Sequence, residues 1–168
     1  MKSNAKSIAL GGMMAALALV ILLLGGLIGV GIYVAPIVAG ILLAVAADRL
    51  PAVFRVMLFL VVAILSFLLV PDLEESLLFA AFFGWYPLVA DRFSPLRPWL
   101  RWMLKLILFN ACLIGAEALL MLVLIPATEP WWFLLVLLVL FNVVFLLYDH
   151  ILPRAKLLLS RLMAKIGF

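Results

Sequence analysis

"IALGGMMAALALVILLLGGLIGVGIYVAPIVAGILLAVAA", residues 8–47, is a run of forty residues without a charged side chain. A transmembrane helix needs about 20 apolar residues to cross the roughly 30 Å hydrocarbon core of a bilayer. The run is therefore long enough for two crossings, and the stretch "GGLIGVG" between them contains the glycines that a tight reversal favours. Pro36 lies close to the start of the second predicted helix, where its missing N–H costs least.

Similar apolar runs follow along the rest of the chain, which has 168 residues, 70% hydrophobic and 12% charged. This composition excludes a soluble domain, because water must satisfy the exterior of such a domain. We therefore predict an all-α integral membrane protein, with a bundle of six transmembrane helices over residues 1–152 and a short, basic, amphipathic C-terminal helix over residues 153–168. The six helices are predicted over about residues 8–24, 32–47, 52–70, 76–90, 99–125 and 131–148.

The basic residues give this topology an orientation. All twelve fall near helix ends that share one side of the membrane: Lys2, Lys6, Arg49, Arg55, Arg92, Arg97, Arg101, Lys105, Arg154, Lys156, Arg161 and Lys165. The turns expected on the other side, "GGLIGVG", "PDLEE" and "PATEP", contain none. Because basic loops stay in the cytoplasm, we expect both termini there, in a multi-pass protein of the bacterial inner membrane. The net charge of +4 then reflects topology and does not indicate a nucleic-acid partner.

One acidic residue is predicted inside the bilayer, in the stretch "LFNACLIGAEALLMLVLIP" (108–126). Glu117 precedes Pro126 by nine residues, roughly 13 Å along a helix. An ionisable side chain in this position costs at least about 2.5–3.5 kcal/mol on insertion scales, so it is a functional candidate. Three interpretations are open: contact with a ligand or cation in an outward-open cavity, a neutral acid hydrogen-bonded to another helix, or coupled proton movement.

Four other side chains are candidates for ligand contact. Asn110 shares a helix face with Glu117, and Asn142 could face Asn110 from the sixth helix, either as a ligand contact or as an interhelical hydrogen bond. Tyr33 and Trp132 are expected near the outer surface, where they could cover a ligand. The acids of the outer loops form a negative rim there: Asp72, Glu74, Glu75 and Glu129.

The aromatic stretch "FFGWYP" (82–87) could stack against a flat ligand, and a tightly packed, kinked helix is the other interpretation. Enzyme chemistry is not expected, because His150 is the sole histidine and forms neither a Ser–His pair nor a metal cluster. No phosphate-binding loop is present, so an ATP-driven step would belong to another chain. We therefore expect no catalytic residue, no cofactor and no metal.

Small residues recur at four-residue spacing on the first helix. Gly11 and Ala15 form one ridge and Gly12 and Ala16 a parallel one. Such ridges let another helix backbone approach closely, either within this chain or on a separate membrane subunit.

Six short helices, cytoplasmic termini and this small-residue face together resemble the S components of energy-coupling-factor vitamin transporters. The resemblance implies that Gly11, Gly12, Ala15 and Ala16 contact a membrane coupling subunit. It also implies a vitamin site in the outer half of the later helices, with partner ATPases supplying the energy. The expected function is thus the substrate-binding subunit of an uptake transporter for a small, vitamin-like solute.

Two further resemblances bear on function. The segments "PDLEESLLFAAFFGWYP" and "FNVVFLLYDHIL" are similar to an uncharacterised group of small bacterial membrane proteins. Rod-shape-determining proteins of the MreD type are also small, with five or six helices and cytoplasmic ends, which implies a non-catalytic scaffold of envelope assembly as the alternative. A polar, outward-facing cavity at Glu117 would favour solute binding over the scaffold.

Overall fold

The computed structural model describes residues 2–29, 31–123 and 131–165, and these ranges contain helices and no strands. The helical segments are α1 (Lys2–Leu27), α2 (Gly31–Ala47), α3 (Ala52–Leu69), α4 (Leu73–Leu78), the π-helical η1 (Phe79–Phe83), α5 (Tyr86–Val89), the 3₁₀-helical η2 (Ala90–Phe93), α6 (Pro98–Val123) and α7 (Trp131–Lys165).

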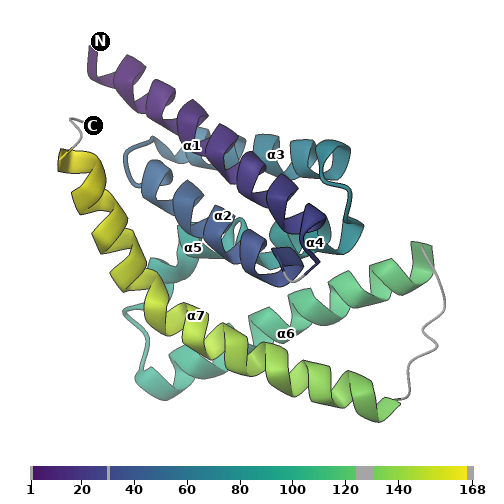
Figure 1. The fold of residues 1–168 in the computed structure, drawn as a ribbon. Helices are drawn as coiled ribbons and strands as arrows, with labels where there is room; N and C mark the ends of the chain where they lie inside the picture. Colours follow the sequence, from purple (N-terminus) through teal and green to yellow (C-terminus); the bar gives the residue numbers. More distant parts are fainter. Residues whose placement is uncertain (1, 30, 124–130, 166–168) are drawn as a thin grey trace.

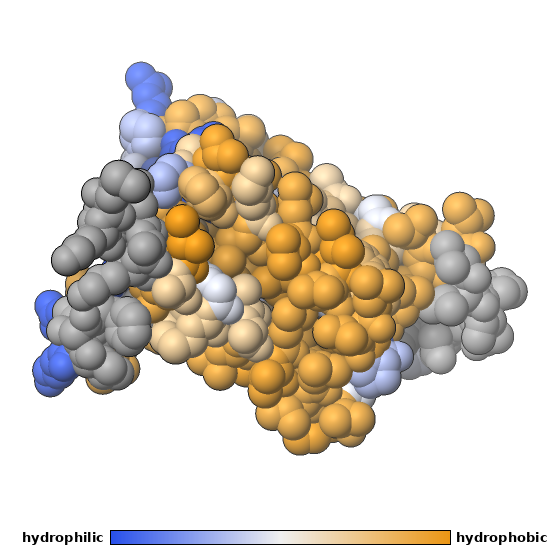
Figure 2. All heavy atoms as spheres, turned by 90° about the horizontal axis from the view of Figure 1, so that it is seen from above, coloured by the Kyte–Doolittle hydropathy of each residue, from blue (hydrophilic) through white to orange (hydrophobic). Residues whose placement is uncertain are grey.

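The helices present the surface of a membrane-embedded protein. Four of the described helices contain stretches long and apolar enough to cross a bilayer: Ile8–Leu27, Ala52–Leu69, Pro98–Leu122 and Leu135–Leu162. The helix α2 is also apolar but shorter. Figure 2 shows a face covered almost entirely by hydrophobic side chains, with the most hydrophilic ones at the left-hand end. Figure 1 places the start of α1 and the end of α7 at that same end.

Small residues bring α1 and α2 together as an antiparallel pair (Figure 1). Ala15, Ala18 and Leu22 of α1 share a buried core with Ala35 and Ala39 of α2. The two predicted small-residue ridges of α1 therefore have different surroundings. Gly11 and Ala15 are buried within the chain, whereas Gly12 and Ala16 are exposed.

The fourth predicted helix is not a single α-helix. Its residues form α4, η1 and α5 in succession, and the N–H of Gly84 bonds to the carbonyl of Phe79 at 2.8 Å, five residues back. Phe82 stacks on Tyr86 with ring centroids 4.5 Å apart, and both are buried. The widened turn lets consecutive aromatic rings enter one core. The stretch "FFGWYP" is therefore a tightly packed, kinked segment.

The C-terminal helix also differs from the prediction, because α7 runs without a break from Trp131 to Lys165. Pro153, expected to separate a surface tail, lies inside it. Pro153 has no N–H for the carbonyl of Asp149, which favours a bend in the helix, and Figure 1 shows α7 changing direction along its length. The following turn is held by Lys156, whose ammonium donates to the carbonyl of Pro87 at 3.3 Å.

Gly40 determines how closely α2 approaches η1. A Cβ atom at Gly40 would lie 2.0 Å from the carbonyl oxygen of Phe83, which is backbone and has no other rotamer. We expect Gly40→Ala to force the two segments apart and to lower stability by about 1–3 kcal/mol, as overpacking does. Thermal unfolding in detergent, followed by circular dichroism, measures the loss.

The matched control is Gly12→Ala, since a Cβ atom there would meet nothing within 4 Å. Its unfolding temperature should be unchanged or slightly higher, because alanine favours the helix. Equal losses in the two variants would contradict the close approach of α2 and η1.

Candidate functional site

Two asparagines join the middle of α6 to the first half of α7. The amide of Asn110 donates to the side-chain oxygen of Asn142 at 2.8 Å, and the amide of Asn142 donates back at 2.9 Å. Each amide also donates to a carbonyl one turn earlier in its own helix, those of Leu106 and Leu138. Both side chains thus have hydrogen-bond partners within the protein, so the pair forms the interhelical hydrogen bond that was one of its two interpretations.

Beyond this pair α6 and α7 diverge (Figure 1), and a cleft lies between them. Its volume is about 300 Å³, at the lower end of the range for small-molecule sites. The lining is apolar apart from one carboxylic acid: Leu113, Ile114, Glu117, Ala118, Met121, Leu135, Leu137, Leu138 and Phe141. Asn110 and Asn142 are not among these residues. They lie beside the cleft, where α6 and α7 meet, and do not line it.

Glu117 projects into this cleft from α6 and is half-buried. It makes no hydrogen bond or ion pair with another residue that the structure describes, and its nearest charged neighbour is the acid Glu74. Asn142, the polar side chain of α7 nearest in sequence to the cleft residues, bonds to Asn110 and not to Glu117.

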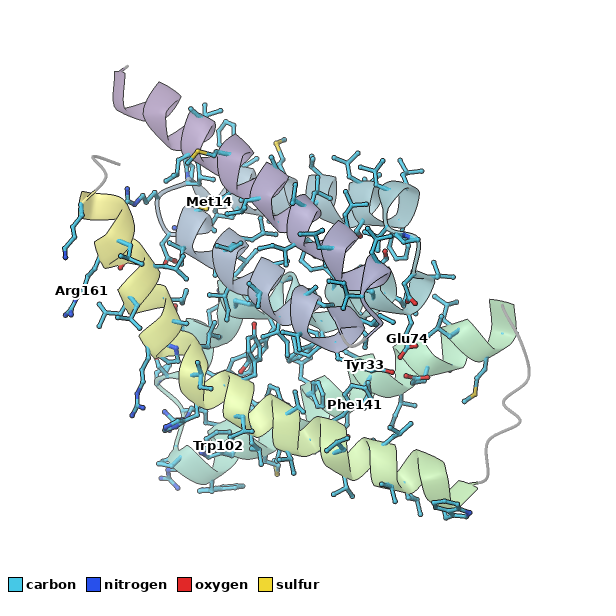
Figure 3. All side chains as sticks on the ribbon, viewed as in Figure 1. Met14, Tyr33, Glu74, Trp102, Phe141 and Arg161 are labelled. Carbon is cyan, nitrogen blue, oxygen red and sulfur yellow. The ribbon has the colours of Figure 1, made fainter. Side chains whose placement is uncertain are left out.

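Tyr33 connects the cleft to the acids of α4. Its hydroxyl donates a hydrogen bond to the Glu74 carboxylate, and its ring meets that of Phe141 edge-on at 5.4 Å. Figure 3 shows Tyr33, Glu74 and Phe141 at the same end of the molecule. Tyr33 also lines a smaller cavity of about 120 Å³, whose lining shares Leu137 and Phe141 with the cleft.

The remaining sequence-predicted candidates lie elsewhere. Trp132 is exposed on the first turn of α7, outside the two cavities just described. Glu129 falls outside the described residues. Glu75, predicted as part of the negative rim, is instead fully buried against the last turn of α1.

A buried ion pair that the sequence did not reveal joins the first third of α6 to the middle of α7, on the side of the asparagine pair away from the cleft. The ammonium of Lys105 donates to both carboxylate oxygens of Asp149, at 2.7 and 2.8 Å, and each residue is only 8% exposed. The hydroxyl of Tyr86 donates to the same carboxylate. The ammonium also lies 5.6 Å from the ring centre of Trp102, within reach of a cation–π interaction.

Next to this pair is a polar pocket of about 260 Å³, whose lining includes Arg101, His150 and Lys156. Lys156 bonds to Asp91 at 3.1 Å and lies 3.6 Å from Asp48. Most charges around the pocket are therefore already paired with one another. This arrangement stabilises the join between α5, α6 and α7 and leaves few groups for a ligand.

Removing one partner of the buried ion pair should strongly lower the stability of the protein. Lys105→Met leaves the Asp149 carboxylate uncompensated and is expected to cost about 3–5 kcal/mol, measured by unfolding in detergent. The double variant Lys105→Met/Asp149→Leu should recover part of that loss, because no lone charge remains. Lys156→Met, whose partner Asp91 is 81% exposed in its side chain, is the control and should cost less. Equal losses for Lys105→Met and Lys156→Met would contradict the assignment.

Within the described residues, no three His, Cys, Asp or Glu side chains lie close enough together to hold a metal ion. Comparisons with protein-family models, curated proteins and solved structures give no match to this chain. Its function is therefore inferred from its own residues and contacts.

Proposed function

We propose that this protein is the substrate-binding subunit of a small-solute uptake transporter, and that the cleft between α6 and α7 is its solute site. The observation that carries the proposal is Glu117: a half-buried acid without a hydrogen-bond or ion-pair partner among the described residues, in an otherwise apolar cleft of about 300 Å³. An apolar cavity with one well-placed polar group is typical of a small-molecule site.

The charges around the cleft favour one class of solute. Glu117 and Glu74 are both acids, and none of the residues lining the cleft is basic. A solute with an apolar body and a positively charged nitrogen would fill the lining and pair with Glu117. Tyr33, between Glu74 and Phe141, is placed to contact the solute at the edge of the cleft.

The direction of uptake follows from the topology that the sequence predicts. The cleft is lined by the second half of α6 and the first third of α7. These parts lie at the end away from the start of α1 and the end of α7 (Figure 1). With six crossings and cytoplasmic termini, as the positive-inside rule indicates, this end faces outward. The protein would then take its solute from outside the cell and release it inward with the help of partner subunits, a membrane coupling subunit and ATPases.

A charged ligand series tests the solute site. Purified protein in lipid nanodiscs is heated with aromatic tertiary and quaternary amines, and separately with neutral compounds of the same shape. The amines should raise the unfolding temperature of the natural protein, because a ligand that binds only the folded state stabilises it. Glu117→Gln should remove the shift, whereas Asp48→Asn, an exposed acid on the α2–α3 turn, should retain it. Equal shifts for amines and neutral compounds would contradict the proposal.

Substitutions on the exposed ridge of α1 test whether this ridge binds a coupling subunit. Gly12 and Ala16 face away from the rest of the chain, so leucines there should be tolerated by the fold. We expect the natural protein, purified gently from its native membrane, to retain a coupling subunit and ATPases identified by mass spectrometry. Gly12→Leu/Ala16→Leu should lose them without a change in unfolding temperature.

Val139→Leu is the control, because Val139 is 64% exposed on α7, another helix. It should retain the same partners. Recovery of cell-wall assembly proteins in place of a coupling subunit would favour the scaffold alternative and contradict the transport proposal.

A further inference from the structure

Glu75 is a buried acid without a partner. It lies in α4 and is 0% exposed, and neither of its carboxyl oxygens has a hydrogen-bond partner among the described residues. An ionised carboxylate in such surroundings is costly, because nothing replaces the water it has lost. Glu75 is outside the four long apolar stretches, at the end of the molecule that carries the cleft.

Two consecutive glycines of α1 make room for this carboxyl group. A Cβ atom at Gly25 would lie 2.4 Å from one carboxyl oxygen of Glu75, and one at Gly26 would lie 3.0 Å from the other. The same Gly26 position is bounded by Val70 and Pro71 at the end of α3. The carboxyl group is therefore enclosed by α1, α3 and α4, and the pocket exists because residues 25 and 26 have no side chains.

The α1 side of this pocket disfavours a negative charge. The carboxyl group lies against the last turn of α1, which ends at Leu27, and the C-terminal end of a helix is the negative end of its dipole. The nearest ionisable group is another acid, Asp72, whose carboxylate accepts the backbone N–H of Glu75 at 3.0 Å.

No positive group faces Glu75 from the elements packed against it. The other titratable groups at this end of the described chain are Glu74, Tyr33 and Glu117. η1 contains no titratable residue. The charged residues of α1 and α3 lie in the first two turns, at the other end of those helices: Lys2, Lys6 and Arg55. A proton is therefore the simplest positive partner for the carboxylate.

We propose that Glu75 is a proton-binding site whose proton holds α4 against the C-terminal end of α1. As the neutral acid, Glu75 gains an O–H that can donate to a carbonyl of the last turn of α1. The carbonyls of Leu24 and Gly25 there already accept the N–H of Ile28, and a carbonyl oxygen has a second lone pair for such a donor. Loss of that proton to bulk water leaves a charge that is stabilised only if α4 moves outward. The inference does not depend on solute binding, although α4 also carries Glu74, which bonds to Tyr33 at the cleft.

The stability of the folded protein is expected to fall as the pH rises and Glu75 loses its proton. Burial, with a smaller contribution from the Asp72 carboxylate, raises the pKa of Glu75 from 4.5 to about 7. The folded state thus holds the proton more tightly than the unfolded state does. The stability present below the ordinary pKa is lost as the pH rises from 4.5 through about 7, and it levels off above that.

Hydrogen exchange of the α4 amides, read by mass spectrometry on the full chain in nanodiscs, tests the proposal. After correction for intrinsic exchange, the opening of residues 73–78 should increase up to about tenfold per pH unit between the two pKa values. Glu75→Gln, neutral and of the same shape, should remove this dependence and keep α4 protected at high pH. Glu74→Gln, the adjacent acid, is the matched control and should retain it.

Further outcomes would overturn the proposal. These are an unchanged pH dependence in Glu75→Gln, and protection of α4 that follows sodium concentration at constant pH and ionic strength, which would make the occupant a metal cation. Glu75→Met serves as a second neutral variant if Glu75→Gln fails to fold. Failure of both while Glu74→Gln folds would show that the carboxylate itself is required, and would also overturn the proposal.

Discussion

The position of the cleft depends on where polar side chains join α6 to α7. In a membrane, two helices gain no hydrophobic energy from meeting, so hydrogen bonds and close packing determine where they touch. Here the bonds join Lys105 in the first third of α6 to Asp149, and Asn110 in the middle of α6 to Asn142. Beyond the asparagines the helices diverge, and the space between them is the cleft that contains Glu117.

Three acids at one end of the molecule show how strongly the environment determines the role of a side chain. Glu74 bonds to Tyr33, Glu117 lies half-buried in the cleft, and Glu75 is enclosed without a partner. Adjacent residues of one helix, Glu74 and Glu75, point to different surroundings, one toward the cleft and the other toward α1. The first is suited to contacts with another molecule, whereas the second acts on the packing of its own helix.

Hydropathy predicts the helical membrane class and most long helices, because a bilayer requires a minimum apolar length. The antiparallel arrangement of the fifth and sixth predicted helices also placed Asn142 opposite Asn110, and the two side chains do bond to each other. Three features depended on contacts between distant segments and had no local signal: the continuation of α7 through Pro153, the burial of Glu75 and the Lys105–Asp149 pair. Lys105 follows Arg97 and Arg101 in sequence, so its charge pattern resembles a surface turn although its side chain is buried.

The π-helical turn at Phe79–Phe83, with the turn at residues 84–85 that follows it, changes the direction in which the side chains of α5 point. Each residue of an α-helix advances the side chain by about 100° around the axis. The wider turn accommodates one residue more than an α-helical turn would, so Tyr86 and Pro87 face directions that a regular helix from Leu73 would not give them. The hydroxyl of Tyr86 reaches Asp149 because of that offset. The one extra residue in the π-helical turn therefore lets a side chain of the aromatic core contact the ion pair of α6 and α7.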